Sequence, residues 1–130
     1  MKTSVTLTAI ACLFGLTGLA HGGMIASPSI FGAFPQQDRA QCIIRNLGTT
    51  SISAVVTIFG ESGEVIATTS CGGLVTPGHN CSAFATIASG VAYACSATTS
   101  GSVKKLRGTL ILFNSVDPGD LEPLRSAQLR

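Results

Sequence analysis

Hydrophobic and polar residues alternate along much of the chain, in short runs that turn-forming residues separate. The run from 51 to 59 (SISAVVTIF) places Ile52, Ala54, Val56 and Ile58 on one face and serine and threonine on the other. A period of two residues is typical of a β-strand with one buried face. The same interpretation predicts further strands over 40–46, 64–70, 81–88, 91–99, 103–114 and 121–129.

The turns between these runs decide the fold class. Gly60-Glu61-Ser62-Gly63 predicts a hairpin, and no stretch has the length and period of a crossover helix. About seven short strands without crossover helices favour an all-β fold, an antiparallel sandwich of the immunoglobulin type or a small barrel. We expect residues 40–130 to form this single domain. Residues 21–39 would be a loose arm, or an edge strand built from Met24-Ile25 and Ile30-Phe31.

The N-terminal segment has the pattern of an export signal. Lys2 supplies a basic start, residues 5–20 are uncharged and largely apolar, and Gly18-Leu19-Ala20 fits a cleavage site. Cleavage after Ala20 would place the protein outside the cytoplasm, secreted or periplasmic. The run is shorter than a bilayer span, and no later stretch predicts one. The alternatives are a retained anchor and lipidation of Cys12, which follows a weak lipoprotein box.

Cleavage would remove Cys12 and leave Cys42, Cys71, Cys81 and Cys95. Four cysteines in an exported domain predict two disulfides, with three connectivities open. No CxxC spacing favours a zinc or redox site. Cys42 and Cys95 fall on an early and a late strand, as in the inter-sheet bridge of immunoglobulin-like domains, while Cys71 and Cys81 flank a turn. We therefore favour the pairs Cys42–Cys95 and Cys71–Cys81.

Three short motifs suggest a family. They are Cys42-x-Ile44-x-Asn46-x-Gly48, Leu74-x-x-Pro77-Gly78-x-x-Cys81 and Tyr93-x-Cys95. In this spacing the chain resembles, over about residues 40–113, small secreted bacterial proteins with an immunoglobulin-like sandwich, a generally uncharacterised group. The resemblance implies a fold and a location, and it carries over no catalytic residue.

Charge gives little guidance toward a partner. The chain has a formal net charge of +2 and only 11% charged residues, which is no reason to expect nucleic acid or an anionic membrane. Lys104, Lys105 and Arg107 form the one basic cluster, without the aromatic platforms of a nucleic-acid site. We interpret these charges as a device against edge-to-edge strand pairing.

Catalytic and metal motifs are scarce. After cleavage the chain would keep two histidines, His21 and His79, and it has no nucleophile elbow, phosphate loop, EF-hand or HExxH motif. We therefore expect no enzyme activity and no cofactor or metal.

Two places remain as candidate partner-binding residues. The first is the loop 71–81, with Leu74, Val75 and His79 as candidate contacts. If the loop is only a turn closed by a disulfide, Leu74 would be its inward anchor and His79 would lie in solvent. The second is the outward pair Ile111 and Phe113, unless a bulge at Gly108 changes the alternation.

For the pair Ile111 and Phe113, we favour coverage by the segment 121–129 over a partner. Two functions follow from these observations. The first is a structural or binding module for an envelope or extracellular protein or glycan. The alternative is a secreted hydrolase inhibitor that presents the loop 71–81.

Overall fold

The computed structural model describes residues 22–31, 37–114 and 125–130. The predicted signal peptide, Cys12 and His21 therefore lie outside the described residues, as does part of the segment 121–129.

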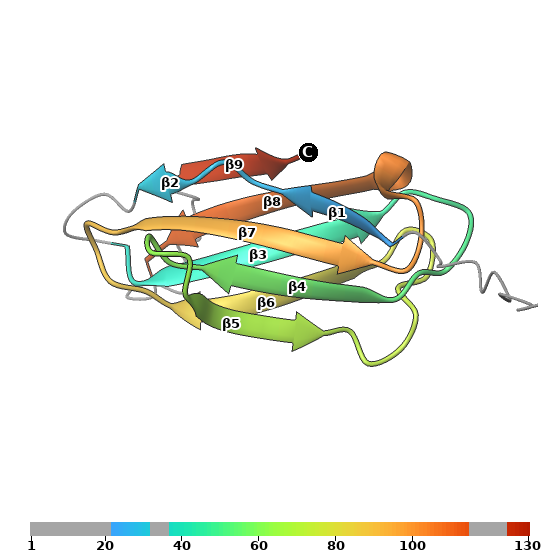
Figure 1. Ribbon diagram of the computed structural model, residues 1–130, viewed down its shortest axis with the longest axis horizontal. Coiled ribbons are helices and arrows are strands. Elements are labelled where there is room, and N and C mark those ends of the chain that lie inside the picture. The colour runs from blue at the N-terminus through green and yellow to red at the C-terminus, as the bar shows by residue number, and fades with distance from the viewer. Residues whose placement is uncertain (1–21, 32–36, 115–124) are drawn as a thin grey trace, which may run out of the picture.

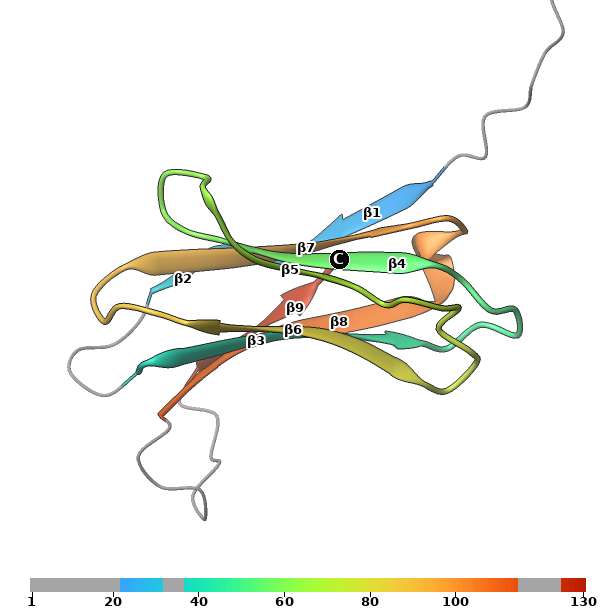
Figure 2. The same ribbon diagram turned by 90° about the horizontal axis from the view of Figure 1, so that it is seen from below.

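Two antiparallel sheets pack face to face as a sandwich (Figures 1 and 2). The first sheet has the order β1 (Gly23–Ala26), β7 (Ala92–Thr99), β4 (Ala54–Phe59) and β5 (Val65–Ser70), and the two-residue β2 (Ile30–Phe31) also pairs with β7. The second sheet has the order β6 (Asn80–Thr86), β3 (Arg39–Asn46), β8 (Leu106–Phe113) and β9 (Arg125–Leu129). The prediction of an all-β antiparallel sandwich is confirmed.

The alternation seen in the sequence is the alternation of burial in the fold. Along β4 every second side chain is buried, and Val56 and Ile58 are fully so. They meet Ile44 of β3 and Leu110 of β8 in one core between the sheets. Burying these aliphatic side chains supplies the main driving force for packing the two sheets together.

The run from 103 to 114 differs from its prediction at its start. Val103–Lys105 forms a short 3-10 helix, η1, because the Ser102 hydroxyl accepts a hydrogen bond from the Lys104 amide. β8 begins only at Leu106, and its alternation passes through Gly108 without a bulge.

Both predicted disulfides are confirmed. Cys42–Cys95 joins β3 to β7 across the sandwich, with its Cα atoms 6.1 Å apart. Cys71–Cys81 joins the end of β5 to β6, with a Cα separation of 6.0 Å. Each bridge therefore links the two sheets.

The two sides of the sandwich are built differently. On one side, the amide of Ala26 donates to the Arg130 carbonyl and the amide of Arg130 donates to the Ala26 carbonyl, both at 3.1 Å, so β1 and the end of β9 close the gap between the sheets. On the other side, β5 and β6 are the outermost strands, as Figure 2 shows. Within the described residues, each of these two strands pairs only with its inner neighbour, β4 or β3.

Candidate functional site

The loop 71–81 is anchored by a different residue from the one predicted. Leu74 is 62% exposed, whereas Val75 is 5% exposed. The backbone of Val75 pairs with Ile52, through hydrogen bonds of 2.7 and 3.2 Å, and this bridge turns the Val75 side chain into the core. The prediction that Leu74 is the inward anchor is wrong, because neighbouring side chains in extended backbone point to opposite faces.

Asn46 holds this loop in place from the end of β3. Its side chain is 2% exposed, and its Nδ2 donates to the carbonyls of Val75 and Thr50, both at 2.8 Å. Its Oδ1 accepts from the Gly48 amide at 2.9 Å, and its backbone carbonyl accepts from Gly78 at 2.7 Å. The Asn-x-Gly and Leu-x-x-Pro-Gly motifs are thus two halves of one hydrogen-bonded structure.

His79 is an exposed residue of this turn. Its Nδ1 lies 2.7 Å from the Thr76 hydroxyl and 3.2 Å from the Pro77 carbonyl. Within the described residues, no group of three or more His, Cys, Asp or Glu side chains is placed to hold a metal ion. The contacts of His79 are those of a turn that stabilises itself.

The second candidate pair lies on the outward face of the second sheet, which we call the outer face. Ile111 and Phe113 of β8 point outward, half-buried among their neighbours. Two residues that the sequence analysis did not single out lie beside them, Ile43 of β3 and Phe84 of β6. Phe84 is 59% exposed. Strand register places the four apolar side chains on one surface, with Gln41 of β3 between Phe84 and Ile111.

The prediction that the segment 121–129 covers Ile111 and Phe113 is wrong for the part of that segment that the structure describes. β9 pairs beside β8, with Ser126 opposite Ile111, so it extends the sheet and leaves the outer face uncovered there. The interpretation of Lys104, Lys105 and Arg107 as edge protection is also wrong. β8 pairs with β3 on one side and β9 on the other, and is therefore an interior strand.

Arginines flank the apolar part of the outer face at both ends. Arg45 of β3 and Arg107 of β8 lie opposite each other, an arrangement that is unfavourable for like charges. Arg107 donates to the Leu106 carbonyl at 2.7 Å, which fixes its guanidinium without neutralising it. At the other end Arg39 donates to the Thr86 hydroxyl at 2.7 Å. None of the described outward side chains of these strands is acidic.

A hollow of about 250 Å³ opens beside Arg45 and Arg107, and its lining also includes Ile43 and Ile111.

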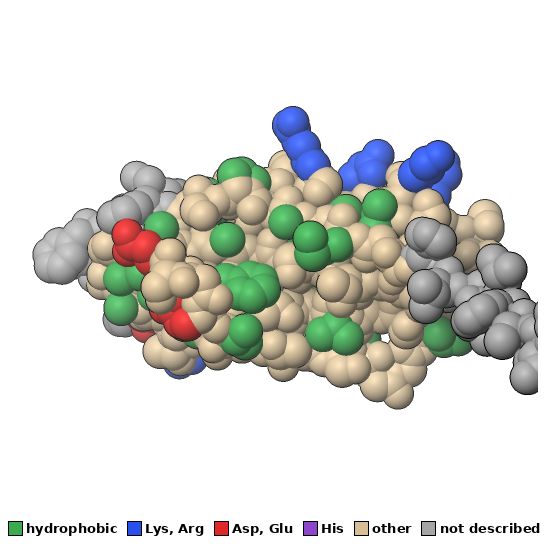
Figure 3. Space-filling model, in the orientation of Figure 1, with side chains coloured by type: hydrophobic (Ala, Val, Ile, Leu, Met, Phe, Trp, Pro, Cys, Tyr) green, Lys and Arg blue, Asp and Glu red, His purple; other side chains and the backbone are tan. Residues whose placement is uncertain are grey.

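The opposite face of the sandwich carries its charges differently. Figure 3 shows it over β7, β4 and β5, with Lys and Arg gathered along the upper edge and Asp and Glu near the left end. A broad uncharged surface lies between them. Exposed apolar side chains occur on that face too, including Met24 at 65% and Val65 at 62% exposed. The outer face of the second sheet differs in placing arginines on the same strands as its apolar side chains.

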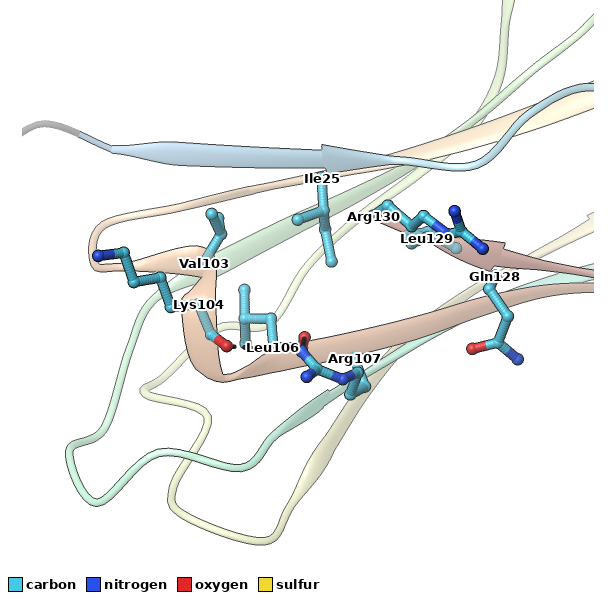
Figure 4. Close-up of a pocket in the computed structure, with 8 residues that line it drawn as sticks. All are labelled: Ile25, Val103, Lys104, Leu106, Arg107, Gln128, Leu129 and Arg130. Atoms are coloured by element: carbon cyan, nitrogen blue, oxygen red, sulfur yellow. Dashed lines mark hydrogen bonds between the residues drawn. The ribbon is translucent and has the colours of Figure 1, made fainter.

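A larger pocket, of about 400 Å³, lies at the closed side of the sandwich. Its walls include the buried side chains of Ile25, Leu106 and Leu129, and its rim carries Lys104 and Arg130. Figure 4 shows the side chains of Lys104 and Arg130 at opposite ends of the pocket. Arg107 also lines this pocket, and its guanidinium donates to the Leu106 carbonyl. Because the side chains of Lys104 and Arg130 lie apart, the pocket is a weaker candidate than the outer face.

Comparison with models of protein families, with curated proteins and with solved structures finds no match to this chain. Among the described residues, no helix has the length and apolar character that crossing a membrane requires.

Proposed function

We propose that the protein is an exported, non-enzymatic binding module that takes a polypeptide partner on its outer face. The observation that carries this proposal is the exposed Phe84, which shares one surface with Ile43, Ile111 and Phe113. Apolar side chains gathered on one surface mark an interaction site more often than scattered single residues do.

The composition of the outer face favours a protein over a glycan. Protein interfaces are enriched in aromatic residues and arginine and depleted of other charged residues in their centres. Here Phe84 and Ile111 lie on either side of Gln41, Phe113 lies opposite Arg39 at one end, and Arg45 and Arg107 lie at the other end. The three cations fit a partner that is acidic around an apolar centre, because opposite charges steer and orient the two surfaces.

We also propose that the sandwich is immunoglobulin-like. Three features support it. Cys42–Cys95 bridges the sheets between β3 and β7. Two residues before Cys95, the Tyr93 hydroxyl accepts from the Ala88 amide at 2.8 Å and donates to the Ala88 carbonyl at 3.2 Å, as in a tyrosine corner. The pairing of β3 with β6 and of β4 with β7 also matches the strand pairing of immunoglobulin domains. The position of β8 beside β3 departs from that strand order.

Export by a signal cleaved near Ala20, into the periplasm or the medium, belongs to the same proposal. Two disulfides in a small domain support it, because such bonds persist in oxidising compartments. The resemblance to secreted bacterial proteins points the same way.

Two phenylalanines allow a matched test of the binding surface. Phe84 lies on the outer face of the second sheet, and Phe59 of β4 points outward from the first. Replacing each in turn with photo-reactive benzoylphenylalanine, in the native host, should give an adduct with one acidic protein from position 84 and none from position 59. The purified adduct protein should then bind wild type, and replacing Phe84 with Ser should weaken binding at least tenfold. Adducts only from position 59, only with glycans, or from neither position would contradict the proposal.

A second candidate function rests on Leu74. This side chain projects from a loop that a disulfide and the Asn46 hydrogen bonds hold in one shape, as the bait loop of a hydrolase inhibitor would require. A panel of extracellular proteases and glycosidases tests it, with Leu74→Ala as the variant and Leu47→Ala, another exposed leucine, as the control. Inhibition that Leu74→Ala abolishes and Leu47→Ala retains would support this function. If the wild-type protein inhibits no enzyme of the panel, the inhibitor function is excluded.

A further inference from the structure

Among the described residues, no strand pairs with the outer edge of β6. Its seven residues, Asn80–Thr86, include no charged residue and no proline, and its register with β3 is continuous. Natural sheets usually block such an edge with lysine, proline, a bulge or a cover, because an open edge pairs with other chains. β5 is the other outermost strand of the open side. Its pairing with β4 shifts register between Ile58 and Phe59 of β4, and such an irregularity is one of these devices.

The backbone of β6 offers hydrogen bonds to an added strand. The Ile87 amide donates to Asp38 and the Asn46 amide donates to His79, which fixes the phase of the β3–β6 ladder. Alternate residues of an antiparallel strand direct their backbone groups to the same side. The amides and carbonyls of Ser82, Phe84 and Thr86 therefore point away from β3. The side chain of Phe84, the middle residue of these three, is also exposed.

Arg39 brings a positive charge to the same edge. It lies on β3, and its Nη1 donates to Thr86 Oγ1 on β6, so the guanidinium reaches across onto the edge strand. A guanidinium has five N–H donors, and a single hydroxyl uses one of them. The remaining donors can hold a carboxylate with a bidentate geometry.

We propose that the partner binds by strand addition: an extended segment pairs with the edge of β6 and continues the second sheet. This inference rests on the proposed function, since it names how the partner is held. Phe84 and Thr86 are two residues apart on one face. The segment therefore carries an apolar side chain against Phe84 and an acidic one, two positions away, that pairs with Arg39. Backbone pairing supplies affinity and the two side chains supply selectivity.

The test uses an acetylated nine-residue peptide of alternating valine and threonine with leucine and glutamate two positions apart. Ser82→Pro removes an outward N–H that β3 does not use, so the fold tolerates it, as edge strands tolerate proline. Ser82→Val keeps the N–H and is the matched control. We expect Ser82→Pro to weaken peptide binding at least tenfold and Ser82→Val to change it less than twofold.

A charge swap tests the second half of the proposal independently of the backbone. Arg39→Glu should weaken binding of the glutamate peptide at least fivefold and should bind a lysine version of the peptide better than wild type does. Absence of peptide binding to wild type at millimolar concentration, or equal binding by Ser82→Pro and Ser82→Val, would overturn strand addition. If the partner that Phe84 crosslinks still binds Ser82→Pro with full affinity, the proposed function stands and this inference fails.

Discussion

The side-chain amide of Asn46 donates to the carbonyl of Val75 across 2.8 Å, from the end of β3 to the buried residue of the 71–81 loop. This bond lies in the interior, where a polar group without a partner is costly. It connects two turns that are far apart in the sequence and fixes the shape of the loop that leads into β6.

Replacing Asn46 with Ala should destabilise the protein by about 3 kcal/mol, because it leaves the buried carbonyl of Val75 and the partly buried amide of Gly48 without their partner. Urea unfolding followed by circular dichroism measures this. The control is Asn80→Ala, an exposed asparagine, which should change the unfolding free energy by less than about 0.5 kcal/mol. Equal effects of the two variants would show that the Asn46 bonds do not hold the loop.

The two disulfides should be reduced in order of exposure. Cys71 is partly exposed, whereas Cys42 and Cys95 are buried. Mild reductant on the folded protein should open Cys71–Cys81 first, and mass spectrometry after alkylation identifies the thiols.

Opening the short loop should lower the unfolding free energy by about 3 kcal/mol, and losing Cys42–Cys95 by about 4 kcal/mol, because the longer loop restricts the unfolded chain more. Alkylation of Cys42 and Cys95 before Cys71 and Cys81 would contradict the burial of the inter-sheet bridge.

Gly108 is required by the approach of β9. A Cβ at this position would lie 2.9 Å from Leu129 Cδ2 and 3.0 Å from the Ile43 carbonyl oxygen. Gly108→Ala should therefore cost about 2 kcal/mol through overpacking, seen as a lower midpoint in urea. Gly72→Ala meets no atom within 4 Å and is the matched control, with an expected change below about 0.5 kcal/mol. A Gly108→Ala protein as stable as Gly72→Ala would argue against the β8–β9 pairing.

The β4–β5 hairpin should respond to acid. The Ser62 hydroxyl and amide both donate to Glu64 Oε2, and these bonds lower the pKa of the Glu64 carboxyl below its ordinary value of 4.5. A carboxyl with a lowered pKa in the fold contributes stability that is present above its ordinary pKa and is lost as pH falls through the lowered value. Carbon-13 NMR titration should show this shift, and Ser62→Ala should move the pKa back upward. A Glu64 pKa that Ser62→Ala leaves unchanged would exclude the hydroxyl as its cause.

Much of the fold was predictable because burial follows sequence alternation. Ile52, Ala54, Val56 and Ile58 are all buried, as their period of two indicates. The phase of the 71–81 loop was not predictable, because it depends on the bridge between Val75 and Ile52, which lie 23 positions apart. The short helix η1 was missed because it rests on local contacts, such as the Ser102 cap, that no hydrophobic period indicates.

The candidate surface was predictable only in part. The run 81–88 does place Phe84 opposite to the buried Cys81, Ala83 and Ala85, so the sequence contained the signal for an outward phenylalanine. The grouping of Phe84 with Ile111 depends on the order β6-β3-β8, which local patterns do not specify.

Amide hydrogen exchange of β6, measured without a partner and with the protein that crosslinks at Phe84, shows whether an added strand pairs with this edge. In the free protein the amides of Ser82, Phe84 and Thr86 should exchange quickly, and those of Cys81, Ala83 and Ala85 slowly, because only the latter bond to β3. In the complex we predict at least tenfold slower exchange at Ser82, Phe84 and Thr86. Unchanged exchange at all three, with new protection confined to residues 72–76, would contradict strand addition and place the binding site on the loop.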